Sequence, residues 1–327
     1  MTSSTTLEPT STPTDEGQLV AVLDAVLPAG ARPRDGALLE PAGPTMASPS
    51  WWGADSTRYV LRGATTTFVK VLDPHAHRLV DASASFQAAR SAGEAGIGPR
   101  VLGADPGPGV IAMELVAGRT GTLDRFASLD AVEQLAQARR RVHRLAPFAR
   151  TATVFDDLHA ALAEAARSGA TLPPDVPHLV RRAALVERAV LASGADAVPC
   201  HADGNLSNVL VLDDGSVRLV DWDVATNCDP LQDVGALLAE LCGPSWSMGR
   251  LDGEEVFEVI WGSLDRTSFS RARAFGAVEM LRWAVVASCY DAFSPGTHEY
   301  SKFADWQFLR ARAALGSPDL DDLLLHI

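Results

Sequence analysis

The sequence predicts an α+β fold with two lobes, in which a small strand-rich N-terminal lobe precedes a larger helical C-terminal lobe. Short apolar runs separated by Gly and Pro fill much of residues 18–117, whereas segments with helical periodicity fill most of residues 118–327. One strand pair, within residues 208–221, interrupts the helical part. This segregation of strands and helices along the chain indicates an α+β architecture.

The composition is that of an ordinary globular protein, with 47% hydrophobic and 21% charged residues in a chain of 327. This length is sufficient for a sizeable buried core. The formal net charge of -13 argues against a nucleic-acid partner, which would require a basic face. An acidic surface slightly favours a small cationic substrate instead.

The four cysteines form no C-x-x-C pair, so structural zinc and a disulfide framework both fit poorly. Reduced thiols and a cytoplasmic location are therefore expected. No apolar run reaches the ~20 residues of a membrane span, so we expect no membrane partner. Residues 1–17 are rich in Ser, Thr and Pro and lack the features of a secretory signal, which predicts a disordered tail.

The N-terminal lobe is predicted to contain two helices among short strands. Residues 18–28 have helical periodicity and end at a proline. Residues 77–98 form the second helix, which ends in a Gly-rich segment. The strands are expected at residues 37–43, 58–63 and 66–72, with two more on either side of a Pro/Gly turn at 105–109.

The C-terminal lobe is predicted to be built mainly from helices, because apolar residues recur there at helical spacing. These helices are expected at residues 128–145, 154–168, 177–193, 231–241, 252–264, 268–291 and 303–315.

A polar segment followed by a hairpin carries the clearest functional signal. The letters HADGNLSN place His201, Asp203 and Asn208 at the spacing His-x-Asp-x4-Asn. An Asp-Asp-Gly turn then joins two apolar runs and returns the chain, so Asp221 is expected beside Asn208. Amide and carboxylate oxygens suit Mg²⁺, which keeps waters and phosphate oxygens as its other ligands. Asp203 is placed to orient a hydroxyl that attacks a phosphoryl group, or to accept its proton.

This pattern resembles the catalytic segment of protein-kinase-like phosphotransferases, in particular the aminoglycoside phosphotransferase and choline/ethanolamine kinase family. The resemblance implies a protein-kinase-like two-lobed fold, with ATP and Mg²⁺ as cofactors. It implies catalytic roles for Asp203 and Asn208 and metal binding by Asn208 and Asp221. The segment CDPLQDVGALL is similar to the helix start that follows in these enzymes, where Asp229 and Asp233 are expected to be capping and scaffold groups.

The resemblance extends upstream over most of the chain. Lys70, in the strand TFVKVL, is similar to the kinase lysine that reaches the α- and β-phosphates of ATP. The segment Met113, Glu114, Leu115 and Val116 is similar to the hinge whose backbone binds adenine.

The helix after Lys70 departs from the family pattern. Protein kinases pair this lysine with a helix glutamate. Here the expected position falls near Ser85, and the nearest polar alternatives are Asp81 and Gln87. We predict that Asp81 supplies the carboxylate and so supports cofactor binding.

Two further departures lie in the loops. The phosphate loop lacks G-x-G-x-x-G and is placed at residues 43–50 by position alone. Asn205 stands where protein kinases carry a lysine, which removes one charge partner of the transition state. These departures keep open a catalytically silent protein that binds a nucleotide or another ligand.

The acceptor site is expected beyond Asp221, because the helical lobe builds it in such folds. Aromatic and acidic side chains there suit an ammonium group through cation–π and charge contacts. The substrate candidates are Asp223, Trp246, Trp283, Tyr290 and Asp291.

The predicted activity is therefore phosphorylation of a hydroxyl group on a small cationic molecule. A choline- or ethanolamine-like amino alcohol is the first candidate acceptor. An aminoglycoside or another amino sugar, with a role in antibiotic resistance, is the alternative. The protein is expected to be a monomer or a homodimer.

Overall fold

The computed structural model describes most of the chain, and the fold below refers to that part. The described residues are 12–13, 15–33, 38–42, 55–63, 65–194, 196–243, 251–293 and 300–327. The predicted phosphate loop at 43–50 and Trp246 lie outside these ranges, as does most of the predicted tail at 1–17.

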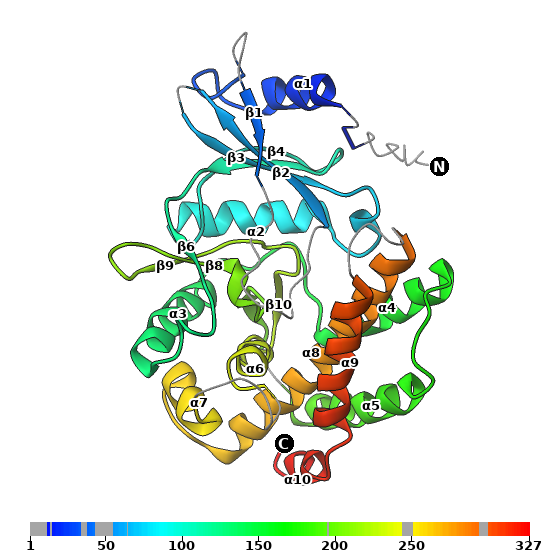
Figure 1. Ribbon diagram of the computed structural model, residues 1–327. Helices are drawn as coiled ribbons and strands as arrows, with labels where there is room; N and C mark the ends of the chain where they lie inside the picture. The colour runs from blue at the N-terminus through cyan, green and yellow to red at the C-terminus, as the bar shows by residue number, and fades with distance from the viewer. Residues whose placement is uncertain are drawn as a thin grey trace, which may run out of the picture.

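The N-terminal lobe is organised around a five-stranded antiparallel sheet, drawn in the upper half of Figure 1. The strand order is β1-β2-β3-β5-β4. The strands are β1 (Leu38–Pro41), β2 (Ser56–Arg62), β3 (Thr67–Leu72), β4 (Val101–Asp105) and β5 (Val110–Glu114).

One helix covers each face of this sheet. Helix α1 (Glu16–Val26) shares a buried cluster with Val69 and Val71 of β3, whereas α2 (Ala82–Glu94) packs with Leu72 on the opposite face. Successive side chains of a strand point to opposite faces. Lys70 therefore leaves β3 on the α2 face, which is the face directed at the C-terminal lobe (Figure 1).

The C-terminal lobe surrounds the long helix α8 (Arg266–Phe293), which packs against α4, α6 and α9. Alanine and glycine at the contact allow close approach: a Cβ added to Gly235 of α6 would lie 2.2 Å from the backbone oxygen of Ala272. The other helices are α3 (Leu129–Val142), α4 (Val154–Ser168), α5 (Val176–Ser193), α6 (Pro230–Leu241), α7 (Gly253–Trp261), α9 (Tyr300–Leu315) and α10 (Asp319–Leu324).

Two small sheets lie between the lobes. The strands β6 (Arg119–Thr120), β8 (Val209–Val211) and β9 (Val217–Leu219) form one, and β7 (Val198–Cys200) with β10 (Thr226–Cys228) forms the other. The N–H of Leu219 donates to the carbonyl of Ile97, 2.9 Å away, so the β8–β9 hairpin is attached to the segment that follows α2.

The predicted α+β architecture is confirmed, with small differences in its elements. Helix α1 begins at Glu16, where Asp15 caps it by accepting from the N–H of Gln18, so the predicted tail extends two residues too far. The sequence analysis missed β6, β7, β10 and α10, since runs of two to six residues carry too few positions to show periodicity.

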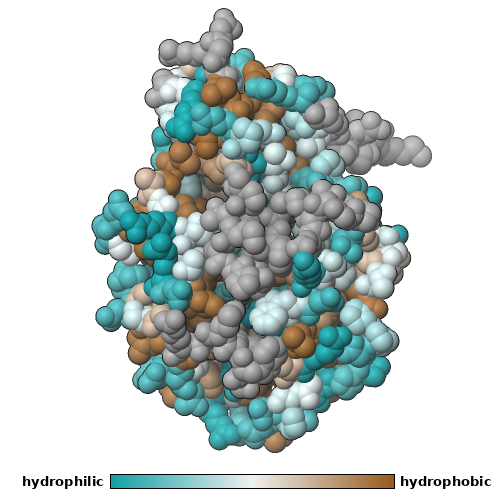
Figure 2. Space-filling view, viewed as in Figure 1, coloured by the Kyte–Doolittle hydropathy of each residue, from teal (hydrophilic) through white to brown (hydrophobic). Residues whose placement is uncertain are grey.

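The surface is typical of a globular chain. In Figure 2, brown apolar residues are interspersed with teal hydrophilic ones on the face shown. Within the described ranges, no helix combines the length and apolarity that crossing a membrane requires.

Candidate active site

The segment after β7 holds Asp203 in a fixed orientation. Asn208 donates from Nδ2 to Asp203 Oδ2 at 2.7 Å, and the backbone N–H of Asn205 donates to Oδ1 at 2.8 Å. Asp203 is only 6% exposed. Because the amide nitrogen of Asn208 faces Asp203, its amide oxygen is the atom that can bind a cation.

The β8–β9 hairpin brings Asp221 back to this segment, as its turn sequence predicts. The N–H of Val220 donates to the carbonyl of Asn208 at 2.9 Å, and Asn208 and Asp221 line the same cavity. Asp221 has a φ of 64°, a left-handed conformation that is uncommon for a residue with a side chain. One amide oxygen and one carboxylate next to Asp203 suit a hard cation such as Mg²⁺.

Lys70 reaches this segment from the sheet of the other lobe. Its Nζ lies 2.7 Å from Asp221 Oδ1 and 2.7 Å from Asp223 Oδ2. The prediction that Asp81 pairs with Lys70 is wrong. The carboxylate of Asp81 instead caps α2 by accepting from the N–H of Ala84 at 3.0 Å. The N–H groups in the first turn of a helix have no partner within the helix, and the residue before the helix can supply one.

Burial controls the charges of these groups. It raises the pKa of the Asp203 carboxyl to about 7; the Asn205 N–H opposes this shift, and the negative charges of Asp221 and Glu279 add to it. Burial alone would lower the pKa of Lys70, but the carboxylates of Asp221 and Asp223 outweigh it and raise the pKa. Lys70 is therefore a cation. The pKa of Asp203 lies near neutral pH, which is the value that suits a general base best.

The two carboxylates beside Lys70 respond differently to it. Burial alone would raise the pKa of Asp221, but the charge and the hydrogen bond of Lys70, together with the charge of Arg58, outweigh burial and lower the pKa. For Asp223, burial prevails over the attraction of Lys70, and the nearby charge of Asp221 adds to it, so the pKa rises. The pKa values of two acids that share one cation are moved apart in this way.

A cavity of about 100 Å³ opens beside Asp203 between the catalytic segment and helices α6, α8 and α9. Trp283 and Tyr290 line it, as predicted for the acceptor site. Among the described residues, Asp223 and Asp291 are not part of its lining, so the structure does not bring these two predicted substrate residues to the acceptor.

The aromatic side chains of the cavity already contact other groups. The guanidinium of Arg282 stacks over Trp283 at 4.1 Å from the ring centroid. The ring of Tyr290 stacks with that of Tyr300 at 5.3 Å. Phe293 also lies edge-on to Tyr290, with ring centroids 5.8 Å apart, so the protein itself covers part of each predicted aromatic ring.

Several lining residues were not singled out from the sequence. Asp55 and Arg58 come from the start of β2, and Arg58 stands opposite Lys70 in the strand register. From the sequence, Arg58 could have been identified as a lining residue only through its pairing with Lys70 across the two strands. Four others come from α9 and carry no motif: Tyr300, Phe303, Gln307 and Arg310.

Two buried acids of the cavity are paired with arginines. Glu279 accepts from Arg282 Nε at 2.9 Å, and Glu240 lies 3.6 Å from Arg310. The lining contains Asp55, Asp203, Asp221, Glu240 and Glu279 as acids and Arg58 and Arg310 as bases. The acids outnumber the bases within the lining, although Lys70 and Arg282, which lie outside it, pair with Asp221 and Glu279.

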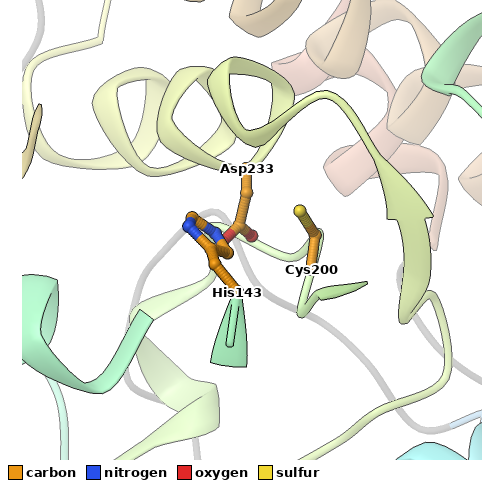
Figure 3. A group of neighbouring side chains, drawn as sticks. All are labelled: His143, Cys200 and Asp233. Atoms are coloured by element: carbon orange, nitrogen blue, oxygen red, sulfur yellow. The ribbon is translucent and has the colours of Figure 1, made fainter. Parts of the chain in front are cut away.

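A second polar cluster supports the segment that carries Asp203, on the side that faces α6. In Figure 3, Asp233 of α6, His143 and Cys200 point toward one another. The carboxylate of Asp233 accepts from His143 Nε2 at 2.9 Å, from Arg139 at 2.7 Å and from the N–H of Ala202 at 2.7 Å. These hydrogen bonds and the arginine charge give Asp233 the partners that a buried carboxylate requires, so the cluster is structural, as predicted for Asp233.

The cluster holds the backbone where the catalytic segment is strained. Ala202 has a φ of 61°, and Arg139 also donates to the carbonyl of Asp203. Burial alone lowers the pKa of His143, but its hydrogen bonds with Asp233 and Cys200, together with the charge of Asp233, outweigh burial and raise the pKa to about 10. His201 contacts the carbonyl of Val220 through Nε2 at 3.0 Å.

Comparison with known proteins agrees with this geometry. The model of a family described as the phosphotransferase enzyme family matches residues 47–266, which is more than half of the chain. None of the curated proteins matches the sequence.

The fold is similar to that of several solved structures. A choline/ethanolamine kinase family protein from Mesorhizobium loti is 24% identical, with a TM-score of 0.73 over 95% of this chain and 98% of that chain. Choline kinase LicA from Streptococcus pneumoniae is 13% identical, with a TM-score of 0.67 over 86% and 94%. A spectinomycin phosphotransferase, solved with ADP and spectinomycin, is 15% identical, with a TM-score of 0.57 over 96% and 98%.

Proposed function

Since the chain belongs to the phosphotransferase enzyme family, we propose that it transfers the terminal phosphoryl group of ATP to a hydroxyl group of a small cationic molecule. The observation that carries this proposal is the position of Asp203. Its buried carboxylate is held by Asn205 and Asn208 at the wall of the cavity that Asp221 also lines.

Asp203 would orient the acceptor hydroxyl and accept its proton as the new bond to phosphorus forms. Its raised pKa suits this role, because a base near neutrality combines an adequate ionised fraction with sufficient basicity. Asn208 holds Oδ2 of Asp203, which fixes the direction in which the carboxylate can accept a proton.

Asn208 and Asp221 would hold Mg²⁺, which when bound neutralises charge on the phosphates. Lys70, a buried cation between the lobes, would hold the α- and β-phosphates. The adenine would lie against the backbone of Met113, Glu114, Leu115 and Val116, at the end of β5 and the start of the connection between the lobes.

The acceptor that fits best is an amino alcohol such as choline or ethanolamine. A cavity of about 100 Å³ suits a compact molecule, and its excess of acids suits an ammonium group. The solved relatives include choline or ethanolamine kinases, which supports this class. The likeness to a spectinomycin phosphotransferase makes an amino-sugar acceptor the second candidate.

The test is acceptor-dependent release of ADP from ATP and Mg²⁺ by the purified protein. Amino alcohols, aminoglycosides and neutral sugars would be compared at equal concentration. We expect turnover with an amino alcohol and little with a neutral sugar. ATP binding without turnover on any acceptor would instead support a catalytically silent protein.

A further inference from the structure

Helix α2 presents a hydroxyl where protein kinases present a carboxylate. Ser85 lies in the second turn of α2, on the face directed at the catalytic segment, and it is only 3% exposed. Asp81 is engaged at the start of the helix and does not take over this role. The carboxylate that contacts Lys70 must therefore come from another element.

The structure supplies that carboxylate from the segment after the hairpin. Asp223 Oδ2 lies 2.7 Å from Lys70 Nζ, and its Oδ1 accepts from Ser85 Oγ at 3.0 Å. Each carboxylate oxygen of Asp223 thus has one partner, a lysine on one side and a helix hydroxyl on the other. The side chain is 11% exposed, so water competes little for these hydrogen bonds.

We infer that Asp223, anchored by Ser85, positions Lys70 for the nucleotide phosphates in place of a helix glutamate. This inference rests on the proposed function, in which Lys70 contacts those phosphates. Asp223 and Ser85 are positioning residues in this account and act on the nucleotide through Lys70. Helix α2 is thus linked to Lys70 through Ser85 and Asp223, whereas a helix glutamate would contact the lysine directly.

The arrangement explains how a chain without the helix acid can still orient the lysine. Lys70 also contacts Asp221, which is the proposed metal ligand. A lysine with Asp221 as its only partner would compete with Mg²⁺ for that carboxylate. The carboxylate of Asp223, held by Ser85, would keep Lys70 in place when Asp221 binds a metal.

The kinetic test compares Ser85→Ala with Ser83→Ala, a matched control on the exposed side of the same helix. Loss of a hydrogen bond to a charged group should raise the KM for ATP roughly three- to tenfold in Ser85→Ala. The kcat and the KM for the acceptor should change less than about twofold, because the acceptor side is untouched. Ser85→Thr, which retains the hydroxyl, should recover most of the ATP affinity.

A second test does not depend on catalysis. The sequence contains two lysines, buried Lys70 and exposed Lys302, so Lys302 serves as an internal standard for acylation by acetic anhydride. Peptide mass spectrometry gives the ratio of the two modification rates. We expect this ratio of Lys70 to Lys302 to rise about threefold or more in Ser85→Ala and to stay at the wild-type value in Ser83→Ala.

The outcomes separate this inference from the proposed function. If Ser85→Ala has the kinetic constants and the labelling ratio of Ser83→Ala, or alters the unfolding temperature alone, the inference is overturned. If ATP neither protects Lys70 of the wild-type protein from acylation nor is turned over, the proposed function fails. The effect of Ser85→Ala on the labelling ratio still decides whether Ser85 and Asp223 position Lys70.

Discussion

On the proposed phosphate side of the cavity, Asp203, Asn208 and Asp221 come from one short stretch of chain tied together by its own backbone. On the proposed acceptor side, Tyr290 and Tyr300 come from two different helices that meet only after folding. The local stretch reads as a motif in the sequence, whereas the helix-built side does not. A reaction type can therefore be inferred from the sequence with more precision than the molecule on which it acts.

The largest expected effect comes from the proposed base on the phosphate side. Asp203→Asn should lower kcat by about 10²- to 10⁴-fold, because the amide cannot accept the acceptor proton. Its thermal unfolding is measured alongside, because the new amide nitrogen replaces an oxygen that accepts a hydrogen bond from Asn205 or Asn208. Steady-state kinetics would show this, with Asp213→Asn in the exposed hairpin turn as the control. A variant with the wild-type kcat would sink the mechanism.

A large effect on stability is expected from the support beneath the catalytic segment. Arg139→Met leaves Asp233 with less compensation for its buried charge and should cost about 3–5 kcal/mol in the free energy of unfolding. Urea denaturation measures this cost. Arg141→Met, on the exposed side of the same helix, should cost less than about 1 kcal/mol. Equal costs for the two variants would show that the cluster is not a specific support.

A moderate effect is expected on the acceptor side. Tyr290→Leu removes an aromatic face from the cavity and should raise the KM for an amino alcohol about 2- to 30-fold. The KM for ATP should not change. The control is Phe269→Leu, at the start of the same helix and away from the cavity. An equal change in both Michaelis constants would mean that the two sides of the cavity are not separable.

The last expected effect is a pH dependence in the stability that the support cluster contributes. The folded pKa of His143 is about 10, above the 6.5 of the free side chain, so the folded state binds the proton more tightly. The stabilisation is fully present below pH 6.5 and is lost as the pH rises through 10. The difference in unfolding free energy between wild-type protein and His143→Gln should shrink from pH 6.5 to pH 10. A difference that grows with pH would show that His143 is neutral, not protonated, in the folded state.

The sequence predicted the parts of the site that are close together along the chain. The hairpin turn predicted that Asp221 returns to Asn208, and the apolar run at residues 66–72 predicted the strand that carries Lys70. The resemblance to the phosphotransferase family is confirmed by the family match. The roles of Lys70, Asp203, Asn208 and Asp221 in the reaction stay predictions.

What the sequence could not predict depends on contacts between distant elements. Asp81 was predicted as the partner of Lys70 because it is the acid nearest to the expected position at Ser85, but its place before α2 commits it to capping. Asp223 reaches Lys70 only because the hairpin packs below the sheet. Arg310 enters the cavity through the packing of α9 on α8, which leaves no local pattern in the sequence.

The central claim is that this molecule transfers a phosphoryl group from ATP to a small cationic alcohol. Phosphorus NMR of the protein with ATP, Mg²⁺ and choline or ethanolamine tests it directly. The account predicts a phosphate monoester that accumulates in step with ADP and is absent with Asp203→Asn. ADP accompanied only by inorganic phosphate, or an ester formed equally well by Asp203→Asn, would contradict it.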